Sequence, residues 1–108
     1  MSSRDTGEPG LAVELDRIIH EPARLKIMAY LYLVESADFV FLVSRTGMTM
    51  GNLSAHMSKL EQAGYIKVEK EILNNRPHTM LSLTTEGKTA FETYRDEIEQ
   101  ILTPAFNQ

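Results

Sequence analysis

The chain has 108 residues, of which 43% are hydrophobic and 24% are charged, and its formal net charge is −4. This length supports one domain with one modest core, and the composition is that of an ordinary globular protein. The absence of cysteine excludes disulfides and thiolate metal sites, and no apolar run approaches the roughly 20 residues that a membrane-spanning helix needs. We therefore expect a cytoplasmic protein that binds no membrane, metal or cofactor.

The acidic total conceals an uneven distribution of charge. Residues 45–78 contain five basic and three acidic side chains, a net of +2, whereas the segments on either side each have a net of −3. Electrostatic attraction depends on the local patch more than on the total. The middle of the chain is therefore best suited to an anionic partner, with few phosphate contacts per subunit.

The chain opens with a polar stretch, residues 1–10, which we expect to be a disordered lead-in to a domain spanning 11–108. Apolar residues then recur every three or four positions, which predicts a helix over 11–19. Pro22 opens the next helix, since the first turn does not need its missing N–H. The apolar face of this second helix is broad, so we expect it at the centre of the core.

Residues 39–63 have the pattern of a helix-turn-helix. The first helix, over 39–46, is a short apolar run, and periodicity alone also allows a brief strand at 38–39. Gly47 ends this helix with a positive φ, and Thr49 is a favourable N-cap for the next one. The second helix buries a stripe formed by Leu53, Met57 and Leu60.

A β-hairpin is predicted over about residues 65–83, because two alternating segments flank a polar turn at 74–77. A final helix over about 85–103 follows, capped by a threonine at position 84 or 85 and ended by Pro104. This order predicts an α+β fold that is mostly α. It is a winged helix-turn-helix with a two-stranded β-hairpin wing and N- and C-terminal helices.

Three segments, in order along the chain, resemble the short, single-domain branch of MarR/ArsR-type winged-helix transcriptional regulators. Residues 20–28 (HEPARLKIM) are similar to the opening helix, and residues 49–66 (TMGNLSAHMSKLEQAGYI) resemble the recognition helix and first wing strand. Residues 83–88 (LTTEGK) resemble the junction after the wing. The resemblance implies a homodimeric regulator that binds a specific double-stranded DNA sequence, with the recognition helix in the major groove and the wing on the backbone or minor groove.

The face of the second helix opposite the buried stripe offers the groups that contact DNA in this interpretation. Asn52 suits adenine, His56 can donate or accept, and Lys59 suits a phosphate. Arg76 at the wing tip suits the backbone or the minor groove. The candidate DNA-binding residues are Arg45, Thr49, Met50, Gly51, Asn52, Ser54, Ala55, His56, Lys59, Asn75 and Arg76.

Each candidate also has a simpler interpretation. His56 and Asn52 fit a partly packed helix surface, Lys59 fits a solvated charge paired with Glu61, and Arg76 fits an ordinary turn. His20 and His78 are far apart without nearby ligand partners, which favours structural roles over metal binding.

The apolar stripe of the final helix fits either the domain's own core or a dimer interface. We expect a homodimer, because the stripe is longer than so small a core requires. The predicted interface consists of Leu11, Leu15, Ile18, Phe91, Tyr94, Ile98, Ile101 and Leu102.

The sequence also bears on two other classes of function. A winged-helix module that binds protein without DNA remains an alternative, because the total charge is acidic. An enzyme is not expected, since the chain has no cysteine, no evident carboxylate pair and no glycine-rich phosphate loop. A small-molecule effector in a pocket between Tyr30, Tyr32, Phe91 and Tyr94 is conceivable, but the sequence offers no support for it.

Overall fold

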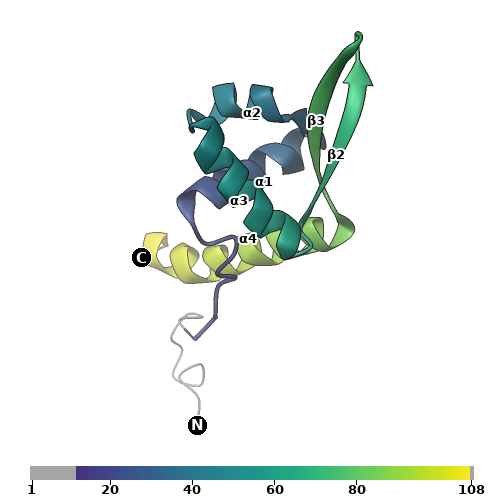
Figure 1. Ribbon diagram of the computed structural model, residues 1–108. Coiled ribbons are helices and arrows are strands. Elements are labelled where there is room, and N and C mark those ends of the chain that lie inside the picture. Colours follow the sequence, from purple (N-terminus) through teal and green to yellow (C-terminus); the bar gives the residue numbers. More distant parts are fainter. Residues whose placement is uncertain (1–11, 108) are drawn as a thin grey trace.

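The computed structural model describes residues 12–107 (Figure 1). Four helices and a three-stranded antiparallel sheet follow one another in this region, which confirms the predicted winged helix-turn-helix. The elements are α1 (Pro22–Val34), β1 (Ser36–Asp38), α2 (Phe39–Thr46), α3 (Met50–Gln62), β2 (Ile66–Leu73), β3 (Arg76–Leu83) and α4 (Thr85–Phe106).

The core lies between the helices and the base of the hairpin. α1 contributes three buried residues to it, as expected for a central helix, and a glutamate side chain caps its first turn. Leu42 of α2 and Leu53 of α3 are fully buried against it. The largest side chains without exposed surface are Ile19, Ile27, Met28, Leu31, Leu42, Leu53, Leu60 and Leu81.

The segment before α1 is not helical, so the helix predicted over 11–19 is wrong within the described residues. Asp16 is the physical reason. Its Oδ1 accepts the backbone N–H groups of Ile18 at 2.8 Å and Ile19 at 3.3 Å, and its carbonyl accepts that of His20 at 2.7 Å. An aspartate that bonds its own backbone competes with a short helix. The predicted lead-in and Leu11 lie outside the described residues.

The sheet has the order β1-β3-β2, and β2 and β3 form the wing. At its tip, Asn74 and Asn75 have φ values of 54° and 63°, as a two-residue hairpin turn requires. The base of the wing is buried at Ile66, but Ile72 near the tip is 70% exposed. The predicted half-buried alternation therefore holds only near the base, because the hairpin projects beyond the helices (Figure 1).

β1 is the third strand of the sheet, and the two-stranded prediction did not include it. Ala37 is paired with Leu81 of β3, and both side chains are buried. The strand ends at Asp38, one residue earlier than the 38–39 alternative. β1, which directly precedes α2, therefore connects the start of the helix-turn-helix to the wing.

α4 is capped by Thr84, whose hydroxyl accepts the N–H of Gly87 at 2.9 Å, in agreement with the sequence prediction. The helix continues to Phe106, so the prediction that Pro104 ends it is wrong. Pro104 lies in the last turn, where its missing N–H removes only one backbone hydrogen bond. α4 consequently runs the full length of one side of the domain (Figure 1).

Candidate nucleic-acid interface

The residues between α2 and α3 end the first helix and cap the second. Gly47 ends α2 with a φ of 73°, and the Thr49 hydroxyl accepts the N–H of Asn52 at 3.1 Å. Leu53 and Leu60 are fully buried, and Met57 is half-buried against the core. The opposite face is left to solvent, and its exposed residues are Met50, Gly51, Asn52, Ser54, Ala55, Ser58 and Lys59.

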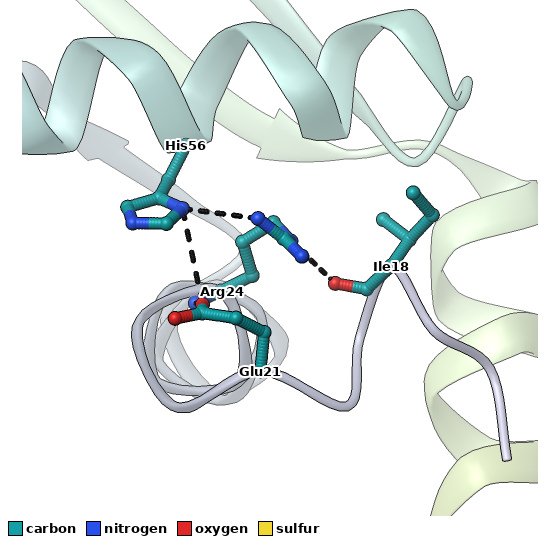
Figure 2. A network of polar contacts seen from close by, with 4 residues as sticks. All are labelled: Ile18, Glu21, Arg24 and His56. Atoms are coloured by element: carbon teal, nitrogen blue, oxygen red, sulfur yellow. Dashed lines mark hydrogen bonds and ion pairs between the residues drawn. The ribbon is translucent and has the colours of Figure 1, made fainter.

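His56 departs from this pattern, because its side chain turns toward α1 instead of the open face. Only 24% of the side chain is exposed. Arg24 Nη1 lies 3.1 Å from His56 Nδ1, and Glu21 Oε1 lies 3.8 Å from the same nitrogen (Figure 2). His56 therefore occupies the flank of the exposed face, where the start of α1 holds one edge of its ring.

Glu21 supplies negative charge beside this flank. Burial opposes its ionisation, but the backbone N–H of Arg24 and the charges of His56 and Arg24 outweigh burial and lower the pKa of Glu21. The same carboxylate caps α1 by accepting the Arg24 N–H at 2.8 Å. Glu21 and Arg24 were missed as site residues, because their contact with His56 joins distant parts of the sequence.

The wing presents Arg76 as the first residue of β3, directly after the Asn74–Asn75 turn. Arg76 is exposed and is paired in register with Leu73 of β2. Further down β2, Lys67 and Glu69 form an exposed ion pair of 3.5 Å. The cation at the tip is therefore better placed for an external anion than the neutralised lysine at the base.

The first half of β3, which starts at the wing tip, and the beginnings of α2 and α3 border a hollow of about 460 Å³. Met50 lines it from α3, and Arg76 and His78 line it from β3. His78 Nδ1 donates to Asp38 Oδ1 at 2.9 Å on its wall. The exposed start of α3 and the wing consequently border the same surface.

Arg45 lies in the last turn of α2, close to the turn that leads to α3. Its guanidinium carbon is 5.0 Å from the centre of the Phe41 ring, a cation–π contact that orients the side chain. Arg45 is exposed. It remains a candidate for a phosphate contact beside α3.

The predicted dimer interface is largely absorbed by the core of the single chain. Tyr94 is only 6% exposed, and its hydroxyl lies 2.7 Å from His20 Nδ1, so this side chain packs within the single chain. Leu15, Ile18, Phe91 and Ile98 also pack against the core. Toward the end of α4, Ile101 is partly exposed and Leu102 is 46% exposed.

The four aromatic residues considered for an effector pocket pack against different partners. The Tyr32 ring packs on Phe91 at a centroid distance of 5.3 Å, whereas Tyr30 packs on Phe41 at 6.1 Å. Tyr94 instead packs on His20. The aromatic rings of this group thus pack in different pairs, and the contacts offer no support for an effector pocket between them.

The two remaining histidines have contacts within the domain. His20 and His78 each contact one partner, Tyr94 and Asp38 respectively. Within residues 12–107 no group of three histidine, aspartate or glutamate side chains is placed to hold a metal ion. Among the helices described, none combines the length and apolarity needed to cross a membrane.

Known proteins share this architecture. A family model described as a winged helix DNA-binding domain matches residues 23–102. An uncharacterized protein of Methanocaldococcus jannaschii is 35% identical over 85 residues, which are 79% of this chain and 92% of that protein. A transcriptional regulator homologue of Pyrococcus horikoshii OT3 has a TM-score of 0.80 and 27% identity, covering 84% of this chain and 90% of that one.

The predicted resemblance to MarR-type regulators is confirmed by the solved structures. A proposed transcriptional regulator of the MarR family from Enterococcus faecalis V583 has a TM-score of 0.72, covering 97% of this chain and 90% of that one. Its identity of 20% makes this a likeness of fold.

Proposed function

Since this chain belongs to the family of winged helix DNA-binding domains and is a DNA-binding regulator, we propose that it binds a specific DNA sequence as a homodimer. The observation that carries the proposal is the exposed face of α3. It combines small residues with Asn52 and Lys59, and it borders the same surface as the wing. In this proposal α3 enters the major groove of DNA, and the bound protein controls transcription. The protein therefore acts in the compartment that contains the chromosomal DNA.

The size of the side chains on α3 supports close approach to the bases. A Cβ atom built on Gly51 meets nothing within 4 Å, and Ala55 is small and exposed. Asn52 then has room for its amide to meet an adenine edge. Lys59, about two turns nearer the end of the helix, is left for a phosphate.

The cations around α3 support contacts with the phosphate backbone. Arg45 precedes the helix, and Arg76 stands at the tip of the wing. An arginine at a hairpin tip suits the backbone or a narrow minor groove. With so few cations, one subunit has only a weak electrostatic attraction to DNA. Two linked subunits on adjacent half-sites bind with higher affinity.

The end of α4 supports the homodimer. Beyond Ile98, the last α4 side chain that packs against the core, Leu102 is 46% exposed and Phe106 is 81% exposed. Large apolar side chains at the end of a long helix are suited to the same helix of a second copy. In this proposal the exposed side chains of Leu102 and Phe106 form the centre of the interface.

In vitro selection of bound DNA from a random pool tests the proposal. We expect an enriched sequence with two inverted half-sites, and binding that weakens as salt rises. The variant Lys59→Glu, Arg76→Glu should lose this binding while remaining folded. Failure to enrich any sequence at low salt would overturn the proposal and favour the protein-binding alternative, which the net charge of −4 supports.

A further inference from the structure

The contact between Arg24 and His56 determines where the neutral His56 ring carries its proton. Arg24 Nη1 lies 3.1 Å from His56 Nδ1. A guanidinium group has only donors, so Nδ1 must accept this hydrogen bond with its lone pair. Neutral imidazole has one protonated nitrogen. His56 therefore carries its proton on Nε2, at the ring edge that points away from Arg24 (Figure 2).

Arg24 is itself held from two sides. Its Nε donates to the carbonyl oxygen of Ile18 at 2.6 Å, and its backbone N–H donates to Glu21 at 2.8 Å. The guanidinium group thus lies between the turn before α1 and the side of α3 (Figure 2). A planar group held at one end has few orientations left, so it acts as a fixed donor for the ring.

Glu21 would favour the opposite tautomer. Its Oε1 lies 3.8 Å from His56 Nδ1, and a carboxylate accepts hydrogen bonds without donating any. If Arg24 were absent, a proton on Nδ1 would be attracted to this carboxylate. Arg24 and Glu21 therefore compete for one nitrogen, and the distances show that Arg24 holds it.

We propose that Arg24 is a positioning residue of the DNA-binding surface, which holds His56 in the tautomer that offers Nε2–H as a donor. The inference rests on the proposed function, in which α3 lies on DNA. A donor at Nε2 pairs with acceptors only, such as phosphate oxygens or the N7 and O6 atoms of guanine. Arg24 acts through His56 and does not itself reach the DNA.

NMR of the free protein with isotope-labelled histidine tests the tautomer, at a pH where His56 is neutral. The wild type should carry the proton on Nε2, and Arg24→Met should move it to Nδ1. The matched control is Arg17→Met, since Arg17 is exposed in the same turn region and should leave the tautomer unchanged. A proton on Nδ1 in the wild type would overturn the proposal. The wild-type measurement can therefore overturn the proposal even if Arg24→Met does not fold.

DNA affinity tests whether Arg24 acts through His56. On the selected DNA sequence, Arg24→Met and His56→Ala should each weaken binding about threefold to tenfold, the range of one hydrogen bond. The double variant should lose no more than either single variant. Multiplying losses would show that Arg24 contacts DNA separately and would overturn the proposal. So would a lower melting temperature of Arg24→Met with an unchanged tautomer, since Arg24 would then be merely structural.

Failure of the proposed function has a different signature. A wild type with the Nε2 proton that binds no DNA at low salt would overturn the function, and with it the role of Arg24 in binding DNA. A wild type that binds DNA with the proton on Nδ1 would overturn only the positioning role.

Discussion

His78 on β3 lies 2.9 Å from the carboxylate of Asp38, and this contact joins the wing to the first turn of α2. The same carboxylate caps α2 by accepting the N–H of Phe41 at 3.2 Å. Burial opposes the ionisation of Asp38, but the hydrogen bonds from His78 and the backbone outweigh burial and lower its pKa below the ordinary 3.8. One charged group thus couples the two elements that border the candidate DNA surface.

The variant Asp38→Asn should lower the free energy of unfolding by about 1 kcal/mol at neutral pH, because it removes the charge from the contact with His78 while asparagine still caps α2. A carboxylate with a lowered pKa stabilises the fold above its unfolded pKa and loses this effect as pH falls through the folded value. The difference between wild type and variant should therefore begin to shrink near the ordinary pKa of 3.8 and vanish below the lowered pKa that Asp38 has in the fold. Urea unfolding across a pH series measures it.

The control for this experiment is Asp96→Asn. Asp96 is 58% exposed and pairs only with the neighbouring Arg95 at 3.1 Å. An exposed pair of this kind contributes little, so its removal should change stability by less than about 0.5 kcal/mol. Equal effects of the two variants would show that Asp38 does not couple the wing to α2.

Tyr65 follows α3 and donates a hydrogen bond to Asp16 in the turn before α1. This hydrogen bond, with burial and the charge of Asp16, raises the pKa of Tyr65 to about 12. A raised pKa means that the stabilisation is complete below about pH 10 and is lost as pH rises through 12. Tyr65→Phe should cost about 1 kcal/mol at neutral pH.

An ultraviolet titration checks this assignment. Wild type should retain a tyrosine that ionises near pH 12, and Tyr65→Phe should lose it. Tyr30→Phe is the control, since the described residues offer the Tyr30 hydroxyl no hydrogen bond, and its ring contact with Phe41 survives the change. The assignment fails if the late-ionising tyrosine persists in Tyr65→Phe.

Gly87 and Gly51 both lie in helices, and alanine should affect them in opposite directions. A Cβ on Gly87 would lie 2.0 Å from the backbone oxygen of Tyr65, whereas one on Gly51 would meet nothing within 4 Å. Gly87→Ala should destabilise the fold by about 2 kcal/mol or more, because backbone atoms must move apart. Gly51→Ala should stabilise it by about 0.5–1 kcal/mol. Chemical denaturation of both variants measures the contrast, and a stable Gly87→Ala would contradict the packing of α4 on this backbone.

Local signals made the helix-turn-helix predictable. Gly47 and Thr49 mark the turn and the cap, and they have the positive φ and the side-chain hydrogen bond that such signals predict. β1 was not predictable in the same way, because three residues carry no periodicity and pair with a distant strand. The apolar spacing of residues 11–19 led to a wrong prediction of a helix. Spacing contains no information on the hydrogen bonds of Asp16, which compete with helix formation.

The candidate site was predictable in outline only. Burial of Leu53 and Leu60 follows from helical spacing, and it leaves the exposed face as expected. The orientation of His56 depends on Arg24, 32 residues away, and helical spacing contains no information on that contact. The packing of Tyr94 within the chain was not predictable for a related reason, because its partner His20 is 74 residues away.

Arg76→Ala tests the wing tip in the complex with the selected DNA. Loss of one phosphate contact should weaken binding similarly for all sequences and reduce the salt dependence by about one counterion per subunit. Arg95→Ala is the control, since Arg95 is exposed on α4 and pairs with Asp96. Binding measured at several salt concentrations gives both slopes. Identical slopes for wild type and Arg76→Ala would exclude a phosphate contact at this residue.

Leu102→Lys tests the homodimer through α4. In a two-fold interface each copy of Leu102 is buried, so the change acts twice. Removal of two buried leucines and addition of two charges should weaken the dimer at least about 100-fold, while the monomer fold persists because Leu102 is already 46% exposed. Sedimentation at several concentrations measures it. Ile72→Lys is the matched control, because Ile72 is 70% exposed on the wing, away from α4. A wild type that sediments as a monomer at every concentration would exclude the homodimer. A dimer that survives Leu102→Lys but not Ile72→Lys would place the interface elsewhere.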